Sequence, residues 1–121
     1  MANPNVVAVS SIYANTAVDA DVAASAVSLL TCGSNKLQKI NSLVIANIDG
    51  TNAATVTVSI STDNGSNYYA IASTVSVPAD ATLVVIDKNS ALYLDETDLL
   101  RIVGSANNDL TYTVSGEKIT D

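Results

Sequence analysis

Three extended segments follow one another within residues 37–71, and two dipeptides that favour tight turns separate them. The dipeptides are Asp49-Gly50 and Asn64-Gly65, which tolerate the positive φ angles at the centre of a hairpin turn. Between them, residues 55–61 read TVTVSIS, so hydroxyl and apolar side chains alternate with a period of two. This period places one set of side chains on each face of a β-strand. We therefore predict a β-meander, with an apolar face on a core and a hydroxyl face toward water or a partner.

The rest of the chain repeats this pattern of short apolar segments and turn formers, and no segment has the period of a helix. Residues 43–48 and 83–86 have apolar side chains on both faces, which predicts inner strands covered on both faces. Pro78 ends a strand, because proline cannot donate to a sheet ladder. About eight short strands predict an all-β fold, a single antiparallel β-sandwich of jelly-roll-like or Greek-key type. The remaining strands are expected at residues 25–31, 68–77, 91–94, 99–103 and 110–115.

Residues 1–23 hold a few apolar positions and then become small, polar and acidic, with no sustained period. We predict that they form an extended amino-terminal arm, and that residues 24–121 form the sandwich domain. The arm is expected either to be solvated or to pair with a neighbouring subunit by adding a strand to an exposed sheet edge. The arm residues expected to contact that partner are Val6, Val7, Val9 and Tyr13.

The core must be built without large aromatic side chains, because the 121 residues include no Phe and no Trp although 48% are apolar. A chain of this length most economically forms one domain, and a thin core of β-branched side chains between two facing sheets is expected. Charged residues make up 14% of the chain, against about 25% in ordinary soluble domains. Such a surface suits a protein partly covered by other subunits, and a monomer with a neutral polar surface is the alternative.

The net charge of −7 argues against nucleic acid and anionic membranes as partners, because both attract basic surfaces. No apolar run approaches the roughly 20 residues of a transmembrane helix. The amino terminus lacks the basic start and apolar block of a signal peptide. Cys32 is the only cysteine, so no disulfide can form within the chain. We expect synthesis in a cytoplasm and a fold held together by packing alone.

Catalytic and metal-binding constellations are scarce, because the chain has no His and one Cys. Zinc sites, Ser-His triads and imidazole acid/base chemistry are thereby excluded, and Cys32 has no base to activate it. Asp95, Glu96 and Asp98 form the only tight acidic cluster, and such a loop is usually solvated. Residues 63–67 offer oxygen ligands around a Gly, as a calcium loop does, but they lack the downstream bidentate Glu and also fit a hairpin turn. No enzyme activity and no cofactor are predicted.

Two residue pairs are candidates for contact with a partner. Tyr68 and Tyr69 are adjacent, so they should point to opposite faces of a strand, one toward the core and one toward the outside. An exposed ring can stack on a sugar or pack against another subunit. Lys36 and Lys39 are paired positive charges at the start of a strand, where they either protect an edge or dock to an acidic neighbour.

Several short features follow one another between about residues 29 and 115. They are Ala46-Asn47, Asp49-Gly50, Val77-Pro78-Ala79-Asp80, Ile86-Asp87 and the loop of residues 94–98, which reads LDETD. In this order the region resembles small structural proteins of tailed bacteriophages, particularly marine and cyanobacterial ones. Asp80 stands where that family usually has Gly, which bears on the type of turn.

The resemblance implies a virion component without catalysis, made in the host cytoplasm. Decoration of the head fits best: many copies of a small acidic sandwich, with a trimer favoured, clamped over the major capsid protein. Neck, tail or fibre accessory roles beside other virion proteins are implied alternatives. A glycan-binding sandwich that attaches to a host surface is a third interpretation, and it rests on the tyrosine pair.

Overall fold

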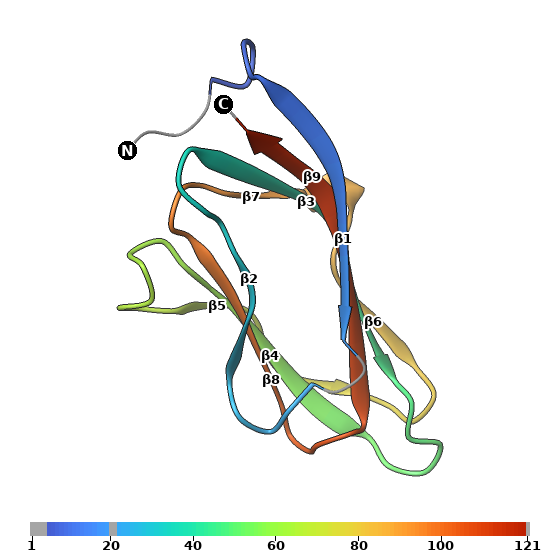
Figure 1. The fold of residues 1–121 in the computed structure, drawn as a ribbon. Helices are drawn as coiled ribbons and strands as arrows, with labels where there is room; N and C mark the ends of the chain where they lie inside the picture. Colours follow the sequence, from blue (N-terminus) through green and yellow to red (C-terminus); the bar gives the residue numbers. More distant parts are fainter. Residues whose placement is uncertain (1–4, 20–21, 121) are drawn as a thin grey trace.

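The computed structural model describes residues 5–19 and 22–120, and in this part of the chain nine strands and one short 3-10 helix form two antiparallel sheets. Sheet A has the order β1-β9-β3-β6, and β7 also pairs with β3; sheet B has the order β2-β8-β4-β5. The two sheets face one another across the core (Figure 1), so the predicted all-β sandwich is confirmed. The elements are β1 (Ser11–Asp19), β2 (Val27–Thr31), β3 (Lys36–Asn47), β4 (Ala54–Ser61), β5 (Tyr69–Val77), β6 (Thr82–Ile86), η1 (Lys88–Ser90), β7 (Leu92–Leu94), β8 (Leu99–Gly104) and β9 (Leu110–Thr120).

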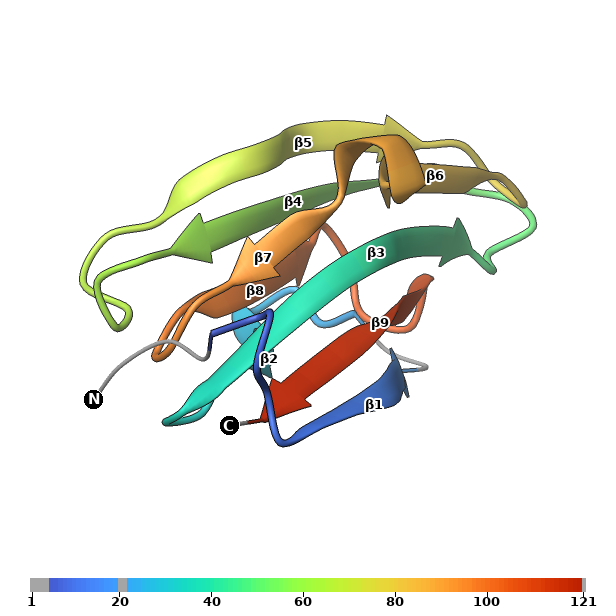
Figure 2. The same ribbon diagram turned by 90° about the horizontal axis from the view of Figure 1, so that it is seen from above.

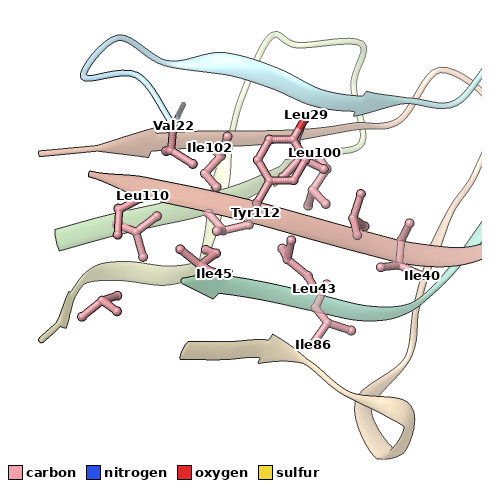
Figure 3. Packing of buried hydrophobic residues seen from close by; sticks show 14 of the residues in the cluster. Val22, Leu29, Ile40, Leu43, Ile45, Ile86, Leu100, Ile102, Leu110 and Tyr112 are labelled. Carbon is pink, nitrogen blue, oxygen red and sulfur yellow. The ribbon is translucent and has the colours of Figure 1, made fainter. Parts of the chain in front are cut away.

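The inner faces of both sheets supply the core, as the period-two alternation predicts. Figure 3 shows side chains from the two sheets pointing into one shared space, with Leu43 and Ile45 of β3 facing Leu100 and Ile102 of β8. All four side chains are fully buried. Tyr112 is the one aromatic ring in the core cluster of described residues, so aliphatic side chains fill the rest. The buried core residues are Val22, Leu29, Cys32, Ile40, Leu43, Ile45, Ala54, Val56, Val58, Val77, Ile86, Leu94, Leu100, Ile102, Leu110, Tyr112 and Val114.

The predicted meander is wrong at its first link. β3 lies in sheet A and β4 in sheet B, so the chain crosses between the sheets at Asp49-Gly50 instead of making a hairpin. The buried Asn47 holds this crossing, because its Nδ2 donates to the carbonyl oxygens of Asn52 and Val77, each at 2.9 Å. The second link is confirmed: β4 and β5 pair through a turn at Asn64-Gly65, where φ is 59° and 88°.

Residues 11–19 of the predicted arm are a strand of the sandwich in this structure. β1 pairs with β9 over nine residues, from Ser11 opposite Thr120 to Asp19 opposite Tyr112, and Val22 is buried in the core. A boundary at residue 23 therefore does not separate an arm from the domain. The physical reason is the alternation within β1, where Asn15 and Ala17 are half-buried and their neighbours are exposed. Residues 5–10 precede the sheet as turns and bends, and residues 1–4 lie outside the described part.

The prediction that residues 43–48 and 83–86 are covered on both faces is also wrong. β3 is an inner strand between β9 and β6, but its outward-facing side chains are only half-buried. Val84 of β6 is 55% exposed, and Ile48 at the end of β3 is exposed too. Apolar residues such as Val84 thus stand exposed on the outer face of sheet A.

The turn before β6 gives Asp80 an unusual backbone conformation. This residue has a φ of 58°, in the left-handed region that Gly enters freely and Asp tolerates. Its N–H donates to the carbonyl oxygen of Asp49 at 3.2 Å. The turn therefore keeps the backbone conformation that a glycine would favour.

Candidate functional site

The outer face of sheet A is a broad surface of small, uncharged side chains. The registers of the sheet align Val18, Thr113, Val44 and Val84 in one row that crosses β1, β9, β3 and β6. Val18 is 70% exposed and Val84 is 55% exposed, so the two ends of the row are open to solvent. Figure 2 shows these strands side by side in that order.

The next row on this face consists of hydroxyl groups. Thr16, Ser115 and Ser42 are in register across β1, β9 and β3, and the hydroxyl oxygens of Thr16 and Ser115 lie 3.1 Å apart. Charge enters only one row further, where Glu117 of β9 is opposite Lys39 of β3. A partner on this face would therefore meet β-branched and hydroxyl groups over its middle and one pair of opposite charges at one end.

The outer face of sheet B is different, because the loop between β4 and β5 folds back over it. The guanidinium of Arg101 lies 3.6 Å from the centre of the Tyr68 ring, a cation–π contact. Tyr68 is half-buried and Tyr69 is 66% exposed. The prediction that one of the two rings enters the core is therefore wrong: neither does, since the loop lays Tyr68 across the sheet from outside.

Asp63 organises that loop through hydrogen bonds to its carboxylate. Its carboxylate accepts hydrogen bonds from the Ser61 hydroxyl at 2.8 Å and from the backbone and side-chain N–H groups of Asn67 at 2.9 and 2.8 Å. These bonds, led by the backbone N–H of Asn67, lower the pKa of Asp63 to about 2. Among the described residues, no group of three or more His, Cys, Asp or Glu side chains is placed to hold a metal ion.

The acidic loop of residues 95–98 is partly structural, contrary to the expectation that it is solvated. Asp98 is buried, and its carboxylate accepts the N–H of Asp95 at 2.9 Å. Burial raises the pKa of Asp98, and the charge of Asp95 raises it further against the opposing effect of that hydrogen bond. Cys32 lies beside this loop: its N–H donates to the Asp98 carbonyl at 2.9 Å, and burial raises the pKa of its thiol. The cysteine is thus a buried structural thiol, as predicted.

The structure places the predicted contact residues in two separate groups. Those on sheet A lie near the end where β1 begins and β9 ends: Tyr13 is opposite Lys118, Lys36 is opposite Thr120, and Lys39 is opposite Glu117. Val6 and Val7 are exposed just before β1, and Val9 is half-buried. Tyr68 and Tyr69 belong to sheet B. The row from Val18 to Val84 was not predicted, because its members come from four strands that are far apart in the sequence.

The described chain contains no pocket, and no helix in it is long or apolar enough to span a membrane. A small-molecule site would need a concave, enclosed lining. What the geometry offers is therefore a set of open surfaces and sheet edges.

No protein family and no curated protein matches this chain. Among solved structures, it is similar to a chain of the T13 particle of infectious bursal disease virus, with a TM-score of 0.53 and 14% identity; the match covers 91% of this chain and 31% of that one. A pentameric capsid protein from metagenomic phage sequences has a TM-score of 0.41 and 15% identity, over 88% and 60% of the two chains. The Drosophila NLP core has a TM-score of 0.45 and 11% identity, over 88% and 96%. This chain thus spans about a third of the virus-particle chain, and it shares the fold of that part.

Proposed function

We propose that this chain is a non-catalytic structural protein of a virus particle. The observation that carries the proposal is the strand order, β1-β9-β3-β6 in one sheet and β2-β8-β4-β5 in the other. Each sheet draws its strands from both halves of the chain, as in an eight-stranded jelly roll made of two Greek keys. Jelly rolls of this kind occur in viral capsid and lectin domains. The similarity to a chain of the infectious bursal disease virus particle supports the same conclusion.

Within the particle, we place the chain on the head of a tailed bacteriophage as a decoration protein on the major capsid protein. The outer face of sheet A supports this role, because a broad uncharged surface on a chain of net charge −7 can pack on a neighbour without bringing like charges together. Modest contacts of this kind are multiplied when many copies bind one lattice. A homotrimer is the assembly that the phage resemblance implies. A neck, tail or fibre accessory protein would use the same surfaces.

The contact residues of this proposal fall on both sheets. The row from Val18 to Val84, the amino-terminal segment and the two lysines lie on or beside sheet A, and the two tyrosines lie on sheet B. Beyond the row itself, the residues are Val6, Val7, Val9, Tyr13, Lys36, Lys39, Tyr68 and Tyr69.

The location is tested on particles whose genome encodes this chain. Quantitative mass spectrometry should find the chain in many copies relative to the major capsid protein, and gold-labelled antibodies raised against the purified chain should mark the head. Label confined to the neck or tail would support the accessory role instead. Absence of the chain from purified particles would refute the virion proposal.

The docking face is tested with a matched pair of variants on particles that lack the chain. Val84→Glu places a charge on the outer face of sheet A, and Val27→Glu places one at the edge of sheet B, where Val27 is also exposed. Val84→Glu should weaken binding by about 10- to 100-fold, because burying one Val side chain contributes about 1.5–3 kcal/mol. Val27→Glu should bind like the unmodified chain. Equal binding by both variants would show that sheet A does not face the particle.

A glycan-binding module is the second candidate, and the exposed ring of Tyr69 favours it. In this case the isolated chain should be retained on host polysaccharide, and Tyr69→Ala should abolish retention, as should Tyr68→Ala. Tyr93→Ala is the matched control, since Tyr93 is an exposed tyrosine on the other sheet. Retention that survives both loop substitutions would remove this candidate.

A further inference from the structure

β1 differs from every other edge strand in the described part of the chain. It runs for nine residues in unbroken register with β9, and it contains no proline and one charged residue, Asp19. The other edges are interrupted: β2 and β5 have register shifts, β6 has five residues and a shift, and β7 has three residues. Natural proteins usually protect an edge by such shortening, bulging or charge, because an open edge recruits another strand. Figures 1 and 2 show β1 as the last strand of its sheet, with no strand on its outer side.

The hydrogen-bonding pattern identifies which backbone groups of β1 are on the free edge. On β3, the outward-facing Ile48 donates its N–H to Asp109 beside β9, whereas the inward-facing Asn47 donates toward β6. Along an antiparallel strand, successive residues direct their N–H and C=O groups to alternate neighbours. In β9, residues that bond to β3 therefore alternate with residues that bond to β1. The registers place the second set opposite the inward-facing residues of β1, so these inward-facing residues bond to β9. The outward-facing residues, Ile12, Ala14, Thr16 and Val18, direct their N–H and C=O groups to the free edge.

We propose that β1 pairs with β1 of a second copy of this chain, antiparallel about a two-fold axis through Asn15. In this register Ile12 is opposite Val18 of the second copy, and Ala14 is opposite Thr16. All four edge residues of each copy are then in hydrogen-bonded pairs, and each pair exchanges two bonds. If the register between the two β1 strands shifts by two residues, one of these hydrogen-bonded pairs is lost. If it shifts by one, residues that direct their N–H and C=O groups to the free edge are opposite residues that direct theirs to β9. The centred register is therefore the one that satisfies the whole edge.

The side chains of β1 are complementary to themselves in this register. Ile12 is 55% exposed and Val18 is 70% exposed. Across the two-fold axis, Ile12 of each copy would cover Val18 of the other, so this contact occurs twice. The single charge of the strand, Asp19, is opposite Ser11 of the second copy, so the two carboxylates do not face one another. On the inner side Tyr13 meets Ala17. Two copies would thus form one continuous sheet across the two-fold axis.

This pairing does not rest on the proposed virion role, and it limits other assemblies. An edge strand bonds to one partner at a time, and a pairing of identical surfaces closes at two copies. A trimer would have to use another surface, and the β1 contact would then join trimers in pairs.

Register-specific crosslinking tests the pairing on the full chain. The central pair at Asn15 is a non-bonded one, with Cα atoms about 4.5 Å apart, within the range that a disulfide spans. Asn15→Cys should therefore form a disulfide-linked dimer under mild oxidation. Ala17→Cys alone should not, because the two sites lie roughly 13 Å apart along the strands. A mixture of Tyr13→Cys and Ala17→Cys should crosslink again. The unmodified chain is the background control, since its Cys32 is 1% exposed.

Sedimentation provides a second measurement that does not depend on the cysteine variants. The unmodified chain should associate to twice 12.4 kDa, or to a multiple of two copies. Ala14→Pro removes an edge N–H that the single chain does not use, so it should raise the dimer dissociation constant about tenfold or more. Ala14→Val keeps that N–H and should associate like the unmodified chain.

Dimers that Ala14→Pro weakens, together with crosslinked Asn15→Cys, support the pairing. A chain that stays monomeric and does not crosslink overturns it. Oligomers that Ala14→Pro leaves unchanged overturn it too, because they use another surface. If Ala14→Pro abolishes binding to particles while the unmodified chain remains a monomer, the strand on this edge belongs to another protein and the second copy is ruled out.

Discussion

The backbone of β3 lies against Gly116 of β9, and a single methyl group there should cost several kcal/mol. The residue pairs with Ile40, and β3 has a register shift between Ile40 and Ser42 that brings its backbone over the glycine. A Cβ added at Gly116 would overlap the carbonyl oxygen of Lys39, and it would lie 2.8 Å from the carbonyl carbon and 3.1 Å from the Cα of Ile40. Both neighbours are backbone atoms, so no side chain can rotate away.

The magnitude of the Gly116→Ala effect follows from this geometry. Ordinary contact begins at 3.4 Å, so the carbonyl carbon alone must move by 0.6 Å (3.4 minus 2.8). Overpacking of this kind costs about 1–3 kcal/mol, and weakening the two adjacent ladder bonds adds about 0.5–1.5 kcal/mol each. The reduced entropy of the unfolded chain returns about 0.4–1 kcal/mol. We expect Gly116→Ala to lower the free energy of unfolding by about 2–4 kcal/mol.

Urea denaturation followed by circular dichroism measures this loss, and Gly33→Ala is the matched control. At Gly33 the nearest atoms are Cδ and Cε of Lys36, at 3.4 and 3.6 Å, and that side chain is flexible. The control should unfold within about 0.5 kcal/mol of the unmodified chain. If Gly116→Ala is as stable as Gly33→Ala, then β3 and β9 are not in close backbone contact at this point, and the argument fails.

Three further outcomes follow from burial and charge. Leu100→Ala should lower the free energy of unfolding by about 2–5 kcal/mol, because Leu100 is fully buried. Ile48→Ala, at an exposed position, should lower it by less than about 1 kcal/mol. Similar losses at both sites in urea denaturation would contradict the assigned core. The pKa of Asp63 is lowered to about 2 on folding, so its stabilising contribution is present above pH ~4 and is lost as the pH falls toward 2. The difference in unfolding free energy between the unmodified chain and Asp63→Asn should therefore shrink between pH ~4 and ~2. A difference that does not change with pH would contradict the hydrogen bonds to Asp63. Burial raises the pKa of the Cys32 thiol, so a thiol reagent at pH 8 should label it only after unfolding; rapid labelling of the folded chain would show that Cys32 is exposed.

Local pattern was enough to locate the strands, because a period of two is a property of a few neighbouring residues. Residues 55–61 and 110–115 alternate and lie in β4 and β9. The same pattern misplaced the partners: β4 follows β3 in the chain, yet it pairs with β5 and β8 in the other sheet. Alternation states that a strand has two faces, and it does not state which strand lies beside it.

The contact residues named from the sequence stay a prediction. Tyr13 and Tyr69 are exposed in the structure, and Lys39 is half-buried. The row from Val18 to Val84 could not be found in the sequence, because its members come from four strands that only the registers bring together. For the same reason the role of Asp98 was missed, since its burial depends on how the loop after β7 packs beside Cys32.

The amino-acid sequence by itself determined that this chain forms two-faced strands around an aliphatic core, and that it has no His and one thiol with which to do chemistry. Only the folded arrangement shows that β1 is an open edge and not a loose arm, that Gly116 has no room for a side chain, and that Val18, Thr113, Val44 and Val84 form one uncharged row on the outer face of sheet A. The physical reason is the range of the interactions. Side-chain alternation is set between adjacent residues, whereas strand order and register are set by hydrogen bonds between segments as far apart as β1 and β9.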